Sequence, residues 1–193
     1  MPSKAENRNL WAIMLRPLVA AMGIMTCAVC CLAAWQWTAP LSAPTLFPFS
    51  QTWYAKAAVA ATPDAGVADA QMAAKLSPAS AENWMVLAYQ LSRADHGISP
   101  RVVAAIRQSY QASQLAPLAS AYRLSFIFNA WSSLPSDIHE LARHEAQAYG
   151  TSVEGLTFLV QTAPAISDPR ARLEFGMLAL AAKSQFYMPI KKQ

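Results

Sequence analysis

Residues 73–91 read AAKLSPASAENWMVLAYQL, and this stretch predicts two helices joined by a tight break. Pro78 ends the first helix, because proline lacks the backbone N–H that a helix interior needs. Ser80 is a residue type that caps helix N-termini, and Glu82 follows in the first turn. We therefore expect the second helix over residues 80–94, and a break this short favours antiparallel neighbours.

The same signals recur to the end of the chain. Ser99-Pro100 and Ser136-Asp137 are typical of helix starts, and Gly150 supplies the left-handed residue that often ends a helix. Val and Ile are sparse, and no alternating run is long enough to predict a sheet. The expected helices cover residues 64–76, 80–94, 100–115, 118–133, 137–149, 153–162 and 169–186. The predicted fold class of this part is all-α, as an antiparallel helical array.

Apolar and small residues on both sides of the turn after residue 94 follow a recognisable spacing. They are Trp84, Leu87, Ala88 and Leu91 on the first helix, and Ala105, Ala112 and Pro117 on the second. This pattern resembles a tetratricopeptide repeat, in which small residues let paired helices approach closely and a proline closes the unit. The resemblance implies stacked helix pairs that bind other proteins through a concave face lined by the first helices.

The resemblance covers only residues 65–117. Trp84 and Pro117 lie 33 residues apart, which is about five more than the family's spacing within one repeat. Arg123 stands where the next unit would have its Trp. A generic Ala-rich helical bundle is the alternative, and whether residues 118–186 continue the repeat stays open.

Composition excludes several classes of protein. The 193 residues are 54% hydrophobic and 13% charged, whereas an average soluble domain is about 25% charged. A disordered, highly charged polymer is therefore excluded, and three cysteines are too few for a disulfide-stapled miniprotein. The net charge of +4 is modest and evenly spread, so we expect no nucleic-acid partner.

The apolar excess is concentrated in residues 18–37, which read LVAAMGIMTCAVCCLAAWQW. Twenty helical residues span about 30 Å, which matches the hydrocarbon core of a bilayer. No Lys, Arg, Asp or Glu lies between Arg16 and Lys56, and Trp35 and Trp37 are typical of a membrane interface. The sequence therefore predicts one N-terminal transmembrane helix.

Charge predicts the orientation of this helix. Lys4, Arg8 and Arg16 precede it, so the positive-inside rule places the N-terminus in the cytoplasm and the C-terminal domain in the periplasm of a bacterial inner membrane. The predicted organisation is a cytoplasmic tail over 1–16, a transmembrane helix over 17–38, a Pro/aromatic linker over 39–62 and a periplasmic helical domain over 63–193.

A cleavable signal peptide is the alternative to an anchor. Trp35 and Trp37 are bulky where a cleavage site needs small residues. Cys27, Cys30 and Cys31 all lie inside the apolar segment, where we interpret them as small helix residues and not as a redox or metal motif. The translocated part has no cysteine, so its stability must come from packing.

The predicted linker combines prolines with aromatic residues. Pro40, Pro44 and Pro48 keep the chain extended. Trp53 belongs to an aromatic group that we expect at the membrane interface, with docking of a neighbouring membrane subunit as the alternative.

No catalytic or metal-binding constellation is evident. His139 and His144 are five apart, so they diverge by about 140° around a helix, whereas the zinc-protease motif needs a spacing of four. His96 lies in a polar turn. Phosphate-binding glycine loops and nucleophile elbows are missing from the sequence. We expect no enzyme activity, no metal and no cofactor.

Four residues are candidates for partner binding, namely Trp84, Arg107, Arg123 and Trp131. The two arginines lie on successive expected helices and could line a basic groove for an acidic peptide or glycan. A solvated face with scattered acidic partners is the alternative. Trp131 belongs to an apolar stripe, and such stripes are more often core than binding site.

The expected function follows from the anchor and the resemblance. Membrane-anchored tetratricopeptide proteins assist the assembly of envelope complexes, so the expectation is a non-catalytic scaffold for envelope assembly or surface-polysaccharide export. Its partners would be other envelope proteins and the lipid bilayer. The alternative is an accessory subunit that tethers a membrane-bound enzyme complex.

Overall fold

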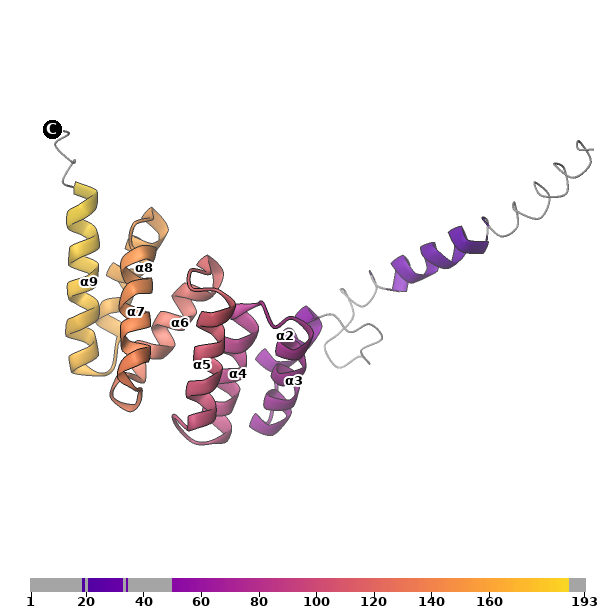
Figure 1. Cartoon of the computed structure of the whole chain (residues 1–193), viewed down its shortest axis with the longest axis horizontal. Helices are drawn as coiled ribbons and strands as arrows, with labels where there is room; N and C mark the ends of the chain where they lie inside the picture. Colours follow the sequence, from indigo (N-terminus) through magenta and orange to yellow (C-terminus); the bar gives the residue numbers. More distant parts are fainter. Residues whose placement is uncertain (1–18, 20, 33, 35–49, 188–193) are drawn as a thin grey trace, which may run out of the picture. The chain divides into compact units, whose positions relative to one another are not determined.

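The computed structural model describes residues 19, 21–32, 34 and 50–187, which Figure 1 colours along the chain. The chain divides into two compact units, Met1–Pro48 and Phe49–Gln193. Every regular element described in the second unit is a helix, which confirms the all-α fold class for this part of the chain. The elements are α2 (Ser50–Ala58), α3 (Pro63–Leu76), α4 (Ala81–Ala94), α5 (Pro100–Ala112), α6 (Pro117–Asn129), η1 (Trp131–Ser133), α7 (Ser136–Tyr149), α8 (Val153–Thr162), η2 (Ala163–Ala165) and α9 (Pro169–Tyr187).

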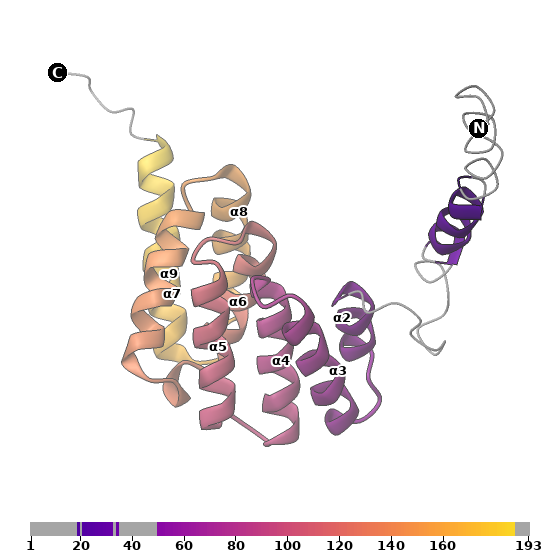
Figure 2. The same cartoon turned by 45° about the vertical axis from the view of Figure 1, so that its right-hand side comes forward.

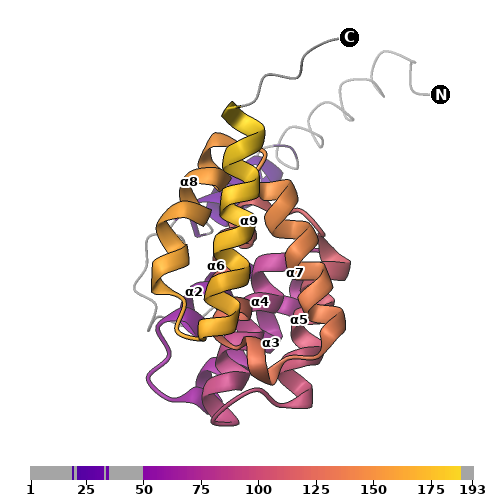
Figure 3. The ribbon, with the colours of Figure 1, turned by 90° about the vertical axis from the view of Figure 1, so that its left-hand side faces the viewer.

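Helices α2 to α9 form a two-layered array that follows chain order (Figure 2). Helix α4 contacts both α2 and α6, and α6 also contacts α8. On the other side of the array, α7 contacts both α5 and α9. The even-numbered helices therefore make one layer, and α9 stands at the end of the array (Figure 3).

Local signals set most helix ends as the sequence predicts. Ser80 Oγ accepts a hydrogen bond from Asn83 N at 3.3 Å, and Ser99 Oγ accepts one from Val102 N at 3.4 Å. Asp168 caps α9, because its Oδ1 accepts from the first backbone N–H groups of that helix. These side chains satisfy N–H groups that have no partner within the helix.

Two predicted signals for helix ends are wrong in detail. Helix α7 has Pro135 as its N-cap, with no side-chain cap bond, in place of the predicted Ser136-Asp137 cap. Gly150 ends α7 in right-handed geometry, at φ −62° and ψ −10°. The left-handed residue is instead His96, at φ 55°, where Gly97 N donates to Ser92 O at 2.9 Å and closes a Schellman-type end of α4.

The linker predicted over residues 39–62 contains a helix. Residues 50–58 form α2, which packs against α3 and α4, and Ala57 is fully buried in the core. This helix was not predicted, and the helices it packs against are separate segments of the chain. Residues 39–49 of the predicted linker lie outside the described residues.

One hydrophobic cluster runs through the array from Ala57 to Ala182. Many of its members are alanines, such as Ala88 on α4 and Ala142 on α7, which are fully buried. Small residues let helix backbones approach closely, while Phe128 and Phe175 fill the wider space between α6 and α9. The body is stabilised by packing, and no cysteine lies within residues 50–187.

In the first unit, residues 21–32 are helical and their side chains are exposed. Within the part of the chain that the structure describes, no helix combines the length and the apolar character needed to cross a bilayer. The predicted span over 17–38 falls partly outside that part, as do Trp35, Trp37 and the predicted tail over 1–16. The membrane anchor therefore stays a prediction.

Candidate functional site

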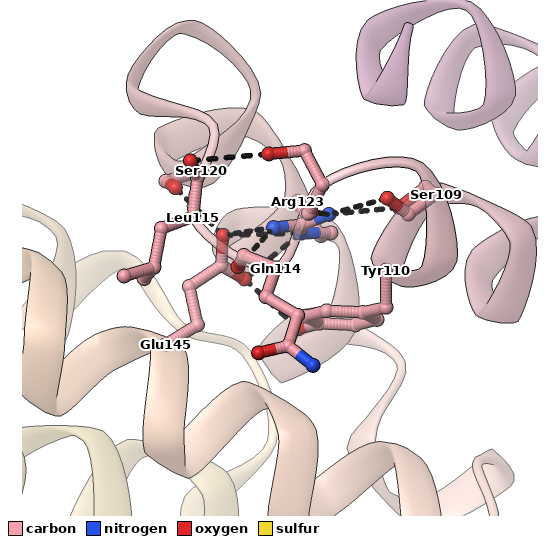
Figure 4. A network of polar contacts seen from close by, with 8 residues as sticks. Ser109, Tyr110, Gln114, Leu115, Ser120, Arg123 and Glu145 are labelled. Carbon is pink, nitrogen blue, oxygen red and sulfur yellow. Dashed lines mark hydrogen bonds and ion pairs between the residues drawn. The ribbon is translucent and has the colours of Figure 1, made fainter. Parts of the chain in front are cut away.

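The most extensive polar cluster described in the chain surrounds Arg123 on α6, at the junction of α5, α6 and α7 (Figure 4). The Arg123 side chain is fully buried, at 0% exposed surface. The prediction that Arg123 lines a surface groove is therefore wrong. A buried guanidinium must find partners for its N–H groups inside the protein.

Arg123 supplies donors to the C-terminal end of α5. Its Nη1 donates to Ser109 O at 3.1 Å and to Ser113 O at 3.0 Å, and its Nη2 donates to Gln114 O at 2.9 Å. Carbonyls at a helix C-terminus lack partners within the helix and carry partial negative charge. The guanidinium therefore caps the end of α5, and this helix ends at Ala112 and not at residue 115 as predicted.

Glu145 on α7 neutralises the guanidinium. Arg123 Nε donates to Glu145 Oε2 at 2.9 Å, and Nη2 makes a short ion pair with Oε1. The same carboxylate accepts from Ser120 Oγ at 2.6 Å and from Tyr110 OH at 2.9 Å. Both carboxylate oxygens thus have partners, and the cluster links three helices.

The Tyr110 phenol completes the cluster and shows what it can do chemically. Arg123 Cζ lies 3.9 Å from the centre of the Tyr110 ring, a cation–π contact. Burial, followed by the negative charge of Glu145, raises the pKa of Tyr110 well above its usual range. Tyr110 therefore remains a neutral donor at physiological pH. The hydrogen bonds and the ion pair of the cluster therefore hold α5, α6 and α7 together.

Trp131 is also part of the core and not an exposed binding residue. It is only 7% exposed, in η1. Its ring stacks on Phe128 at 4.5 Å between centroids and on His139 at 3.8 Å, with Arg143 near the ring at 5.4 Å. The indole is sandwiched between α6 and α7, so a partner has little access to it.

Arg107 and Trp84 lie nearer the surface. Arg107 Nε donates to Asp137 Oδ2 at 2.8 Å, and both side chains are about half exposed. Trp84 is half-buried and donates from Nε1 to Pro78 O at 2.8 Å, which ties α4 to the turn before it. The basic groove of Arg107 and Arg123 is not formed, because one is paired and the other buried. Binding by Trp84 or Arg107 stays a prediction.

Trp53, predicted at the membrane interface, lies on α2. Its ring is half-buried, with Lys56 Nζ 5.2 Å from the ring centroid. Its Nε1 is buried and has no hydrogen-bond partner in the described part of the chain. Its position relative to a membrane stays a prediction.

A row of tyrosines on the even-numbered layer is a surface feature that sequence reasoning missed. Tyr54 on α2, Tyr89 on α4 and Tyr122 on α6, here called the tyrosine row, are 38%, 40% and 41% exposed. The Tyr89 and Tyr122 rings meet edge to face at 6.3 Å. A hollow of about 470 Å³ lies beside these two rings, with Ile98 and Phe126 also lining it.

The tyrosine row combines ring surface with hydrogen-bonding groups. Desolvation, with the neighbouring Tyr89 and Tyr54 phenols adding to it, raises the pKa of Tyr122 above its usual range. The phenol is therefore neutral at physiological pH and can donate a hydrogen bond. Tyrosine is enriched at protein interfaces for this combination of apolar ring and polar tip.

The histidines do not form a metal site with other described residues. His139 is held by the Trp131 stack, with Nε2 2.9 Å from Trp131 O, and His96 occupies the left-handed end of α4. No group of three or more His, Cys, Asp or Glu side chains in the described ranges is arranged to hold a metal ion.

The missed residues differ in whether the sequence held a signal for them. The tyrosine row has spacings of 35 and 33 residues, so a search for residues recurring at that interval would have found it. Glu145 had no such signal, because its partner Arg123 is 22 residues away on another helix.

No protein-family model, curated protein or solved structure matches this chain at a significant level.

Proposed function

We propose that this protein is a non-catalytic, membrane-anchored scaffold of the bacterial inner membrane whose periplasmic helical domain binds other envelope proteins. Envelope assembly or surface-polysaccharide export is the process we propose it serves. The tyrosine row is the observation that carries the proposal. It places one partly exposed aromatic side chain on each of three helices of the same layer.

Repetition in the array supports a tetratricopeptide-like organisation. Contacts between helices two apart in chain order recur along the even-numbered layer from α2 to α8 and again from α5 to α9. The three tyrosines recur at 35 and 33 residues. Repeat arrays present aligned positions of successive units on one continuous face, which suits extended binding of another chain. The tyrosine row would be the centre of that face.

Two features support the anchor. Residues 18–37 contain no charged side chain, and cations precede them. The large apolar side chains described in residues 21–32 are exposed, for example Ile24 and Met25. Such a surface is stable in lipid but not in water. Anchoring would raise the local concentration of the helical domain near membrane partners.

Site-specific photo-crosslinking in intact cells tests the scaffold. Benzoylphenylalanine would replace Tyr89 or Tyr122 in the full chain, with Gln108 on α5 as the matched control, since it is exposed on the other layer. We expect discrete adducts with envelope proteins from the two tyrosine positions and none from Gln108. Equal adduct patterns at all three positions would refute a binding face on the tyrosine row.

The same adducts separate the scaffold from the alternative of an accessory subunit. After mild detergent extraction, several partners in less than equimolar amounts would support the scaffold. One enzyme in a fixed equimolar ratio would establish the subunit role instead. Amino-terminal sequencing of the extracted protein tests the anchor, because a start downstream of Trp37 would mean that the apolar segment is cleaved.

A further inference from the structure

The end of the array carries a second surface, formed by α8 and α9. A groove of about 610 Å³ lies between these helices, and its lining is largely apolar. Leu173 and Leu180 on α9 are each 67% exposed, Met177 is 56% exposed, and Val160 faces the groove from α8. Leu173, Met177 and Leu180 stand at positions i, i+4 and i+7, so they share one side of α9.

This apolar side is additional to the side that α9 buries. Ala171, Phe175, Ala179 and Ala182 of α9 already pack in the core. A helix at the end of an array normally turns a polar face outward, because no further unit covers it. Helix α9 instead exposes a second apolar stripe, which is typical of a surface that another helix covers.

Gly176 strengthens this argument. It lines the groove in the middle of α9, and nothing in the protein lies within 4 Å of the place where its Cβ would be. Glycine in a helix interior is destabilising by about 0.5–1 kcal/mol relative to alanine. Close packing within the described array does not account for this glycine, whereas a close-approaching external helix would.

Charge identifies the kind of partner. Arg172 and Lys183 line the groove, and none of its lining residues is acidic. Arg172 is held by Ile166 O at 2.8 Å, a carbonyl that leaves its positive charge unneutralised. Glu174, the carboxylate on α9, pairs with Arg143 instead. Neither groove cation is in a salt bridge with a described residue.

The chain's own remaining segments have the wrong charge to fill the groove. Residues 188–193 contain Lys191 and Lys192 and no acidic side chain, and residues 1–18 contain three cations and one Glu. Residues 35–49 contain no charged side chain at all. A symmetric second copy would bring the same two groove cations face to face. We infer that the α8–α9 groove binds an acidic amphipathic helix of a partner protein.

Fluorescence anisotropy with the full chain in neutral detergent tests this inference. The probe is a labelled designed helix with leucines at i, i+4 and i+7 and flanking glutamates. The comparison peptide has lysines in place of the glutamates. We expect the acidic helix to bind at least tenfold more tightly, and 0.5 M salt to remove that preference. Equal affinity for both peptides would overturn the inference.

Variants locate the binding. Leu173→Ser with Leu180→Ser, and separately Arg172→Glu with Lys183→Glu, should each weaken binding of the acidic peptide at least tenfold. Leu118→Ser is the matched control, because Leu118 is 87% exposed on α6 and lies outside the groove. Unchanged binding by the groove variants would overturn the inference, as would an equal loss in the control.

Two other occupants give distinct results. Light scattering that shows dimers lost in the Leu173→Ser/Leu180→Ser variant would assign the groove to a second copy. Crosslinking of a photoactivatable phosphatidylglycerol to α9 that the same variant abolishes, without binding of the acidic peptide, would assign the groove to lipid. Tyr89→Ala should leave peptide binding unchanged, so failure here is separable from failure of the tyrosine row.

Discussion

At two helix junctions in this protein, buried side chains donate hydrogen bonds to backbone carbonyls near helix ends. The donors are neutral amides at one junction and a charged guanidinium at the other. At the junction of α2, α3 and α4, two buried side-chain amides bind carbonyls near helix ends. Asn83 Nδ2 donates to Ala73 O at 3.1 Å, and Gln90 Nε2 donates to Ala57 O at 2.5 Å. At the junction of α5, α6 and α7, Arg123 does this for α5 and requires Glu145 to balance its charge.

The difference determines how much each junction depends on any one side chain. A neutral amide is desolvated at modest cost, and its loss leaves a carbonyl short of one bond. A buried guanidinium and carboxylate stabilise only as a pair, because either alone is an unpaired charge in the core. The amide junction should therefore tolerate single substitutions better than the charged junction.

The largest effect is expected from Arg123→Met. This change leaves the Glu145 carboxylate buried without its cation, so we expect a loss of about 3–5 kcal/mol in the free energy of unfolding. Denaturant titration followed by circular dichroism measures it.

Adding Glu145→Leu to Arg123→Met is the companion measurement. The double variant should be more stable than the sum of the two single losses, with a coupling of about 1–3 kcal/mol. Strict additivity would contradict the buried pair. If a single variant is too unstable to purify, the double variant can still be compared with the unsubstituted protein, and its greater stability than the unfolded single variant would support the buried pair.

Gly66→Ala tests the amide junction by crowding it. A Cβ on Gly66 would lie 2.5 Å from Gln90 Oε1 and 2.7 Å from Gln90 Cδ. Because the amide is buried and hydrogen-bonded, we expect a loss of about 1–3 kcal/mol in thermal or chemical unfolding. In a Gln90→Ala background the same change should be less harmful.

Gly176→Ala is the matched control for that glycine. Its Cβ would meet nothing within 4 Å, so we expect a gain of about 0.5–1 kcal/mol from helix propensity. If both substitutions change the free energy of unfolding in the same direction, close packing at Gly66 does not determine the effect of Gly66→Ala.

Gln90→Leu removes the hydrogen bond from Gln90 Nε2 to Ala57 O across the junction at similar side-chain volume. Ala57 O also accepts from Ala60 N at 3.3 Å, so it keeps one partner. We therefore expect a loss of only about 1–2 kcal/mol. Gln108→Leu on the exposed side of α5 is the control and should be nearly neutral. A loss as large as that of Arg123→Met would remove the distinction between the two junctions.

The smallest effect on stability is expected at the surface ion pair of Arg107 and Asp137, which joins α5 and α7 outside the buried cluster. The hydrogen bond from Arg107 holds the pKa of Asp137 below its ordinary value of 3.8. A lowered folded-state pKa stabilises the protein above that ordinary value, and the contribution is lost as pH falls through the folded-state pKa.

Asp137→Asn should therefore flatten the acid limb of the stability profile below about pH 4, with little change elsewhere. Arg107→Gln removes the same bond from the other side and should give the same flattening. The effect is small because both side chains are about half exposed. A large loss at neutral pH would show that the pair is structural.

The success of the helix predictions follows from where their signals lie. Helix α8 occupies residues 153–162 as expected, and α4 begins after its predicted Ser80 cap. Ser and Asp caps accept hydrogen bonds from backbone N–H groups two or three residues away, and proline acts through its own fixed φ and missing N–H. A short window of sequence therefore contains these signals. Helix α2 was missed, and the contacts that it makes are with α3 and α4, which are separate segments of the chain.

The predictions that Arg123 and Trp131 bind partners at the surface failed because the burial of each side chain depends on residues distant in the sequence. Arg123 was expected at the surface because it and Arg107 lie on successive expected helices and could line a basic groove. Only a carboxylate on α7 and carbonyls at the end of α5 make its burial possible. Trp131 was known to belong to an apolar stripe, but its place between Phe128 and His139 required the packing of α6 against α7.

The sequence by itself determined that this body is helical, where most of its helices begin and end, and that no disulfide supports it. Those properties depend on interactions within one helical turn and on composition. The tertiary structure alone decided which arginine is buried, which tyrosines share a face, and which side of α9 lies open. Each of these depends on side chains 20 to 40 residues apart, whose proximity is set by helix packing and not by local propensity.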